Sequence, residues 1–247
     1  SQNNFILNYH PVVNIVTNNI TGLEVLLRWE HPEDGLMSAA QFIHQIEGDK
    51  TFIFVGEWIL KKSLNQLKYW HDLGLKPLTL SMNLSSHQFY EPNLVSVLNT
   101  ALKNIDIDPY SFELEVTEST ILKDKSSSQR ILLDLQDLGI KVAIDDFDMD
   151  TFSIKELRKF AFNTIKIDQQ LIHKLTLKSD EFVKIRFLMS MAEDYNLNVV
   201  AEGVETREQL NLLRSLDCET VQGYLFDYPL SAEDATDVLK SNWLGRQ

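Results

Sequence analysis

Short apolar runs alternate along this chain with longer segments in which apolar residues recur every three or four positions. The short runs are rich in β-branched and aromatic residues, as strands are, and the longer segments have the period of amphipathic helices. This alternation is typical of a parallel sheet whose strands are joined by crossover helices. Eight strand candidates within 247 residues predict one α/β domain with the (β/α)8 fold of TIM barrels. The candidates are FILNYHPVV, GLEVLLRW, LTLSMNLS, FELEVTE, VAIDDF, TIKID, NVVAEGV and TVQGYLF.

Some helix boundaries are also marked in the sequence. The segment EWILKKSLNQLKYWHDLG carries an apolar stripe and stops at Gly74, a residue suited to the C-terminal cap of a helix. The run TREQLNLLRSL opens with Thr206, followed three residues later by Gln209, which is a capping-box pattern. The segment KDKSSSQ, residues 123–129, is predicted to be an exposed loop that leads into a helix.

Nearly every strand candidate carries a polar or charged residue near its end. A charge in a strand buried on both faces is unfavourable unless it is paired or binds an ion, so these positions are candidates for a functional site. In a barrel of this kind the carboxyl ends of the strands converge on one rim, where barrel enzymes have their active sites. In strand order the residues are Glu24 and Arg28, Asn83, Glu115 and Glu118, Asp145 and Asp146, Lys166, Glu202 and Glu205, and Gln222.

Each of these residues has a structural alternative when it is taken alone. Glu24 can be a strand-end carboxylate in an ion pair, and Asn83 can bond its own backbone in a turn. Asp145 or Asp146 can cap the helix that follows. Lys166 alone is more often a solvated or paired lysine than a catalytic one. Taken together, strands that each deliver an oxygen donor or a cation to one rim favour a functional site over a purely structural barrel.

The residue types on this rim indicate a particular metal chemistry. Carboxylate and amide oxygens suit magnesium or manganese rather than zinc or copper, and the six histidines include no H-E-x-x-H pattern or other close pair. The adjacent Asp145 and Asp146 suit two ions, because one carboxylate can bridge while its neighbour binds only the second ion. Two ions form the clamp that assists displacement at phosphorus, and Lys166 can steady a nucleophilic water or neutralise charge on the phosphoryl group. A calcium loop counted from Asp146 fails, since Thr151 takes the glycine position and Leu157 that of the closing glutamate.

The composition narrows the function classes further. The chain has 23 Lys and Arg against 36 Asp and Glu, and the net charge of −13 disfavours long nucleic acids as partners. A small phosphate ligand held through metal ions is compatible with that charge, because the ions supply positive charge. Cys218 is the one cysteine, which excludes an internal disulfide and favours a reducing compartment.

The chain shows no membrane-spanning run and no signal peptide, so we expect a soluble, cytoplasmic domain. It begins at SQNNF without a Met, and we find no linker within it. We therefore expect residues 1–247 to be a single domain cut from a longer multidomain protein, which can itself be membrane-anchored.

Several of these motifs together resemble a known family, the EAL domain, which is the bacterial cyclic di-GMP phosphodiesterase module. The resemblance runs from about Phe5 to Leu239. It implies a modified (β/α)8 barrel that hydrolyses one phosphodiester bond of cyclic di-GMP to give the linear dinucleotide, with magnesium or manganese as cofactor. As partners it implies cyclic di-GMP, a second copy in a homodimer, and a GGDEF, sensor or other regulatory domain in the full-length protein. The matching motifs, in order, are GLEVLLRWEHP, SMNLSSHQF, ELEVTES, VAIDDF, NTIKID, VVAEGVET, EQLNLL and QGYLF.

The resemblance assigns a role to each rim residue by motif. Glu24 stands where the name-giving glutamate of the family binds metal, with Val25 in place of the usual alanine. Asn83, Glu115 and Asp145 match the other ligands of a first ion, and Asp145 with Asp146 those of a second. The expected catalytic residues are Lys166, Glu202 and Glu205, the expected substrate contacts are Arg28, Leu26 and Gln222, and Glu118 is expected to anchor the loop after the fifth strand.

The loop after Asp146 departs from the family pattern. Active members usually continue Asp-Asp-Phe with Gly-Thr-Gly-Tyr-Ser-Ser-Leu, whereas this chain reads DDFDMDTFSIKEL, with both glycines lost. Glycine adopts positive backbone angles more readily than aspartate does. The resemblance implies that this loop couples substrate and metal binding to dimer contacts, so affinity for the second metal, dimer regulation and turnover are the properties that residues 147–155 would change. Two smaller departures are His10, where the family commonly has Gln, and Asp227-Tyr228, where it commonly has Ser-Arg or Ser-Lys.

Three classes of function therefore stay open. The first is a metal-dependent phosphodiesterase, weak or regulated. The second is an inactive EAL domain that acts as a cyclic di-GMP receptor or a protein-interaction module. The third is a barrel enzyme of different chemistry, such as a metal-assisted enolising enzyme, which shares the carboxylate rim but lacks the ordered motifs.

Overall fold

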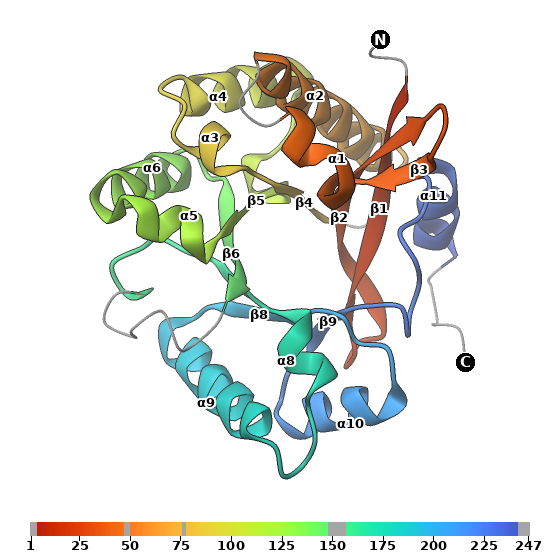
Figure 1. Cartoon of the computed structure of the whole chain (residues 1–247), viewed down its shortest axis with the longest axis vertical. Coiled ribbons are helices and arrows are strands. Elements are labelled where there is room, and N and C mark those ends of the chain that lie inside the picture. Colours follow the sequence, from red (N-terminus) through yellow and green to blue (C-terminus); the bar gives the residue numbers. More distant parts are fainter. Residues whose placement is uncertain (1–3, 47–49, 76–77, 148–156, 242–247) are drawn as a thin grey trace.

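The strands of this chain close into a barrel that is surrounded by helices (Figure 1). The structure is a computed structural model and describes residues 4–46, 50–75, 78–147 and 157–241. The sheet has nine strands in the order β1-β9-β8-β7-β6-β5-β4-β2-β3, and a further pairing of β1 with β2 closes eight of them into a ring. The expectation of a (β/α)8 barrel is confirmed.

The strands coincide with the apolar runs of the sequence. Strands β4 to β9 run parallel to one another, and β2 pairs in parallel with β4, so their carboxyl ends lie at one rim. Their bounds are β1 (Phe5–Asn14), β2 (Asn19–His31), β3 (Gly35–Ser38), β4 (Thr79–Asn83), β5 (Phe112–Thr117), β6 (Lys141–Phe147), β7 (Thr164–Ile167), β8 (Asn198–Ala201) and β9 (Thr220–Gln222).

The first strand breaks the all-parallel pattern that the sequence predicted. Strand β1 runs antiparallel to both of its neighbours, β2 and β9. The link from Asn14 to Asn19 is too short for a crossover helix, so β1 and β2 form a hairpin, in which Asn18 has φ 55°. The short strand β3 was not predicted, and it folds back on β2 outside the ring.

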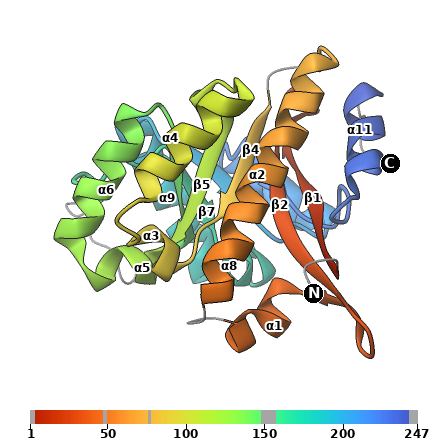
Figure 2. The ribbon, with the colours of Figure 1, turned by 90° about the horizontal axis from the view of Figure 1, so that it is seen from above.

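The helices lie on the outside of the ring in Figure 1, and Figure 2 shows the same ribbon from above. Helix α2 ends before Gly74, which has φ 70° and whose N–H bonds to the carbonyl of His71, and α10 has the predicted capping box of Thr206 and Gln209. Residues 123–129 are mostly helical instead of a loop, because Asp124 caps α6 through the N–H of Ser127. The bounds are α1 (Ala39–Ile46), α2 (Lys50–Asp72), α3 (Ser86–Phe89), α4 (Leu94–Ile105), the 3-10 helix η2 (Pro109–Ser111), α5 (Glu118–Lys123), α6 (Lys125–Asp137), α8 (Gln169–His173), α9 (Asp180–Tyr195), α10 (Arg207–Ser215) and α11 (Ala232–Lys240).

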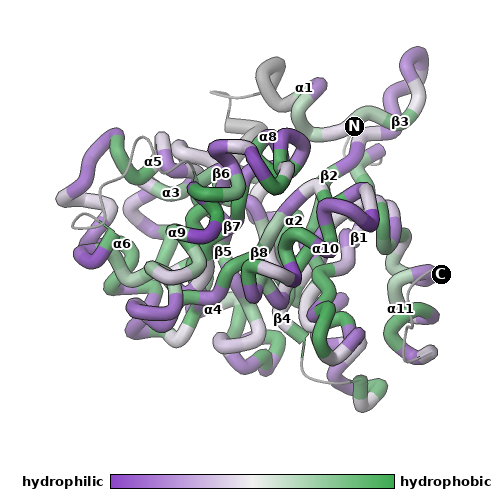
Figure 3. The backbone as a smooth tube through the Cα atoms, turned by 90° about the horizontal axis from the view of Figure 1, so that it is seen from below, coloured by the Kyte–Doolittle hydropathy of each residue, from purple (hydrophilic) through white to green (hydrophobic). Residues whose placement is uncertain are grey.

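The hydrophobic core lies between the ring and the helices. Hydrophobic and hydrophilic segments alternate along the outer helices in Figure 3, as expected when one face of each helix packs on the barrel. Leu64, Leu67 and Trp70 of α2 are fully buried there, and a smaller cluster around Phe42 lies beneath β2. Among the described residues, no helix is both long enough and apolar enough to cross a lipid bilayer. The apolar side chains of these clusters thus pack on the outside of the ring.

Candidate active site

The inward faces of the strands are polar at the carboxyl-terminal rim. Side chains two positions apart on a strand share a face, which places Glu24, Leu26 and Arg28 on one face of β2. The parallel register aligns Asn83 of β4 with Glu115 of β5. These alignments gather side chains from strands that are far apart in the sequence.

The ammonium of Lys166 lies at the centre of this group. It donates to Glu115 Oε2 at 2.7 Å and lies 2.6 Å from Glu202 Oε1. Glu24 Oε2 is 3.5 Å away and Asp145 Oδ1 is 3.6 Å away. The Lys166 side chain is 4% exposed, so these four carboxylates surround it with almost no water.

Glu24 is held in place from both sides. Asn83 Nδ2 donates to Glu24 Oε1 at 2.8 Å, and Gln222 Nε2 donates to Glu24 Oε2 at 2.9 Å. These amides come from β4 and β9, the two strands that flank the hairpin of β1 and β2. The Glu24 carboxylate is therefore fixed in orientation by neutral donors.

Burial and mutual repulsion shift the pKa values of the cluster. Burial raises the pKa of Glu202 to about 8, and it also raises that of Glu115 well above its usual range, where the negative charge of Glu24 adds to the effect. Burial would raise the pKa of Glu24 too, but Lys166 and the hydrogen bond from Gln222 outweigh it and lower this pKa. Burial would lower the pKa of Lys166, but the surrounding carboxylates raise it well above its usual value. One cation thus faces more negative charge than it can neutralise.

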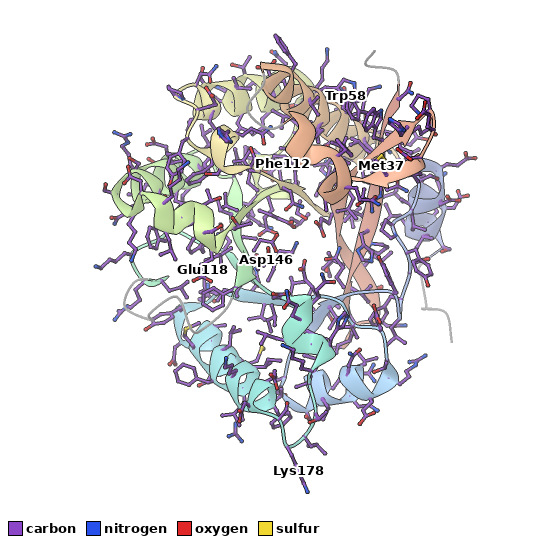
Figure 4. All side chains as sticks on the ribbon, in the orientation of Figure 1. Met37, Trp58, Phe112, Glu118, Asp146 and Lys178 are labelled. Carbon is purple, nitrogen blue, oxygen red and sulfur yellow. The ribbon has the colours of Figure 1, made fainter. Side chains whose placement is uncertain are left out.

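The second aspartate lies at the edge of this cluster. Asp146 has φ 51°, a left-handed backbone conformation, at a point where the register between β6 and β7 shifts. Its pKa is raised by partial burial and by the negative charges of Asp145 and Asp168. Figure 4 places Asp146 beside the end of β6 at the central ring, with Glu118 nearby on α5. The backbone turn explains how two adjacent aspartates can both reach the rim.

The donor set fits a hard divalent cation. The oxygen Oδ1 of Asp145 is buried and accepts no hydrogen bond from the described residues, so it has unused donor capacity. The excess of carboxylates over cations also favours a metal site, because a bound ion would offset the negative charge. Within the described part of the chain, no three acidic, histidine or cysteine side chains already surround one point in the manner of a formed metal site. Lys166 instead bonds directly to Glu115 and Glu202.

The expected substrate contacts lie around this cluster. Arg28 is half-buried and donates to the carbonyl of Leu27, and burial lowers its pKa while Tyr224 and Glu24 oppose that change. Leu26 is partly exposed on the same face of β2. Gln222 is 2% exposed and reaches Glu24, so in this structure it is a positioning group for that carboxylate.

Two other candidates lie outside the cluster. Glu205 is exposed, and its Oε1 is 3.7 Å from Nε2 of His173. Glu118 is buried at the start of α5, one residue after the helix cap Thr117. The loop that Glu118 is expected to anchor lies largely in residues 148–156, outside the described residues, so that role stays a prediction.

An aromatic group at the rim was not predicted from the sequence. The rings of His10 and Tyr224 are 5.9 Å apart, and those of Tyr224 and Tyr228 are 4.6 Å apart. His10 pairs in register with Glu24 and bonds to the carbonyl of Asp227. The departures His10 and Asp227-Tyr228 were visible in the sequence, but nothing there indicated that they meet.

The EAL domain family model matches residues 1–229 of this chain. The chain belongs to the EAL domain family. Among curated proteins it is 36% identical, over 92% of its length, to the bifunctional diguanylate cyclase/cyclic di-GMP phosphodiesterase MucR of Pseudomonas aeruginosa. It is 32% identical, over 93% of its length, to the signaling protein YkoW of Bacillus subtilis. It covers 33% and 28% of these two proteins, so it spans a third or less of each.

Solved structures of EAL domains have the same fold. The MucR phosphodiesterase in complex with cyclic di-GMP superposes with a TM-score of 0.90, at 35% identity and over 94% of both chains. These similarities connect the family of this chain to cyclic di-GMP signalling.

Proposed function

We propose that this domain hydrolyses cyclic di-GMP to the linear dinucleotide. The observation that carries the proposal is the buried cluster of carboxylates around Lys166 at the active rim of an EAL barrel. The 35% identical MucR domain is a phosphodiesterase whose structure contains cyclic di-GMP, and its fold matches over almost the whole of this chain.

The pKa values of the cluster fit general acid–base chemistry. Glu202, with a pKa raised by burial to about 8, has an affinity for protons near neutral pH, as an efficient general base requires. It can accept the proton of the water that attacks phosphorus. Before that proton transfer, the adjacent Lys166 ammonium stabilises the ionised form of Glu202. It can also offset the charge that develops on the phosphoryl oxygens.

We assign the metal ligands as the family pattern does, to Glu24, Asn83, Glu115 and Asp145, with Asp146 for a second ion. Magnesium or manganese bound there would supply the positive charge that activates water and stabilises the displacement at phosphorus. The residues of the chain itself orient these oxygens, since Gln222 and Asn83 hold Glu24 and Lys166 contacts Glu115. Arg28 and Leu26 face the substrate, where the guanidinium contacts a phosphate.

A receptor that holds cyclic di-GMP without cleaving it is the second candidate. It is favoured by the sequence DMDTF in place of the glycine-containing loop, and by the direct bond of Lys166 to Glu115, a prospective metal ligand. In the full-length protein we propose a cytoplasmic location, a GGDEF, sensor or other regulatory domain, and a homodimer of EAL domains.

Incubation of the domain with cyclic di-GMP in magnesium and then in manganese, followed by chromatography, tests the enzyme. The linear dinucleotide is expected with the wild type and with Glu208→Ala, a control on an exposed helix position, but not with Glu24→Ala. Unchanged ligand under both metals would contradict hydrolysis. Calorimetry with calcium in place of magnesium then identifies a receptor, if cyclic di-GMP binds and is recovered intact.

A further inference from the structure

The barrel has a cavity at the end opposite the active rim. This cavity of 240 Å³ lies among the residues that begin the parallel strands. Thr79, Lys141 and Thr220, the first residues of β4, β6 and β9, are partly exposed at its mouth. The floor is formed by Lys166 and Glu115, which are buried. The cavity therefore leads from the amino-terminal face of the barrel to the underside of the catalytic cluster.

The wall of this cavity is polar where most barrels are apolar. The interior of a (β/α)8 barrel is ordinarily filled by layers of branched aliphatic side chains. Here Ser81, Glu113 and Thr164 stand in that layer, and each is less than 9% exposed. Thr164 and Glu113 bond to each other, and a wall of this polarity suits a polar occupant better than an apolar one.

Two opposite charges face the cavity from neighbouring strands. Glu113 of β5 and Lys141 of β6 are partners in register. In the described contacts each of the two is bonded to a threonine of another strand. Glu113 accepts from Thr164 of β7 at 2.6 Å, and Lys141 donates to Thr79 of β4 at 3.2 Å. An ammonium has three donors and a carboxylate has several acceptor sites, so both groups retain capacity for a ligand.

We propose that this amino-terminal cavity binds a compact zwitterion of the size of a small amino acid. Its carboxylate would contact Lys141 and its ammonium Glu113. The lining has two acidic and two basic side chains, Glu113, Glu115, Lys141 and Lys166, so a ligand that carries both a cation and an anion finds a group of each sign. The volume is below the 300–1,000 Å³ of ordinary drug-sized sites, so the ligand must be small.

Occupation of this cavity would reach the active site from beneath. Because Lys166 and Glu115 form its floor, a bound zwitterion would contact the same groups that hold the rim cluster together. A change in turnover on binding is a consequence that rests on the proposed phosphodiesterase function. The binding itself does not, and it is tested without any measurement of activity.

Cysteine labelling measures access to the cavity. Ser81→Cys places a thiol on the cavity wall, and the native Cys218 serves as a silent background because it is 1% exposed and burial raises its pKa to about 12. A small methanethiosulfonate reagent, followed by mass spectrometry, is expected to modify Ser81→Cys but not the wild type. Glycine is expected to slow the modification at least fivefold, whereas glycerol and acetate at the same concentration are not. Failure of labelling, or equal protection by all three solutes, would overturn the proposal.

The charge partner is tested in the same assay. In the Ser81→Cys background, Lys141→Ala is expected to abolish the protection by glycine, while Lys125→Ala, on the outer helix α6, leaves it intact. Circular dichroism checks that both variants keep the fold. Retained protection in Lys141→Ala would overturn the assigned pose and with it the zwitterion site. Loss of hydrolysis with intact protection would affect the proposed function alone.

Discussion

Lys166 Nζ lies 2.6 Å from Oε1 of Glu202, in a contact between the third residue of β7 and the residue after β8. This bond couples two groups whose protonation states depend on each other. The lysine favours the ionised form of Glu202, whereas burial and the neighbouring carboxylates favour the protonated form. The balance between them sets the behaviour of the site with pH.

In the presence of a chelator, the protein is expected to lose stability as the pH rises. The pKa of Glu202 is raised from an ordinary 4.5 to about 8, so the folded state binds this proton more tightly than the unfolded state does. The stabilisation is complete below pH 4.5 and is lost as the pH passes through about 8. Urea denaturation across this range is expected to show a fall in the free energy of unfolding that is about 5 kcal/mol larger in the wild type than in Glu202→Gln. Glu208→Gln should follow the wild type, and parallel curves for all three proteins would refute the assignment.

Gln222→Met is expected to weaken the response of the enzyme to metal. The change keeps the shape of the side chain but removes the donor to Glu24 Oε2, so the carboxylate loses one of its two amide supports. Outer groups that orient ligands typically contribute about 10–100-fold to metal affinity or activity. A titration of phosphodiesterase activity with manganese should shift to roughly tenfold higher concentration. The exposed Gln170→Met is the control, and an unshifted titration for Gln222→Met would argue against orientation of Glu24 by this residue.

Gly223→Ala is expected to be strongly destabilising. A Cβ at this position would lie 2.2 Å from the carbonyl oxygen and 2.3 Å from the nitrogen of Val204, and neither backbone atom can move independently. We expect a loss of about 3 kcal/mol in the free energy of unfolding, measured with urea. Gly35→Ala is the matched control, because Gly35 has φ 72° but open space around it, so only about 1 kcal/mol of backbone strain is expected. Equal losses in the two variants would show that the contact with Val204 is relieved.

Thr236→Val is expected to loosen the attachment of α11. The hydroxyl of Thr236 accepts the indole N–H of Trp70 at 2.8 Å, and Trp70 is fully buried, so the valine variant leaves a buried donor without a partner. The expected cost is about 1–3 kcal/mol in the free energy of unfolding. Thr236→Ser keeps the hydroxyl and should retain most of the stability. If both variants behave alike, the loss is due to the methyl group and not to the hydrogen bond.

The sequence predicted the barrel because its strands are signalled locally, by apolar runs such as VAIDDF and TIKID. It did not predict the direction of β1, because strand direction depends on the length of the Asn14–Asn19 link and on pairing with β9, which is distant in the sequence. Strand β3 was missed for a similar reason, since GLMS is too short to show a period.

The rim residues were found by position at strand ends, but their contacts required the register. That Lys166 bonds Glu115 and Glu202 at once depends on three strands being aligned. Glu113 was not among the predicted site residues, and closure of the barrel buries it. Local pattern therefore identifies which residues lie on the ring, and only the closed ring decides which of them touch.

The pairing of β1 with β9 has a consequence for how the domain is made. Strand β1 is synthesised before the other strands of the barrel, and its hairpin with β2 can form early, but its other edge finds a partner only when Thr220–Gln222 has been synthesised. The bridge between Tyr9 and Leu230 comes later still. Contacts of such long sequence separation slow folding and leave an open strand edge exposed meanwhile. A nascent chain that stalls before β9 would therefore present that edge to chaperones or to other chains.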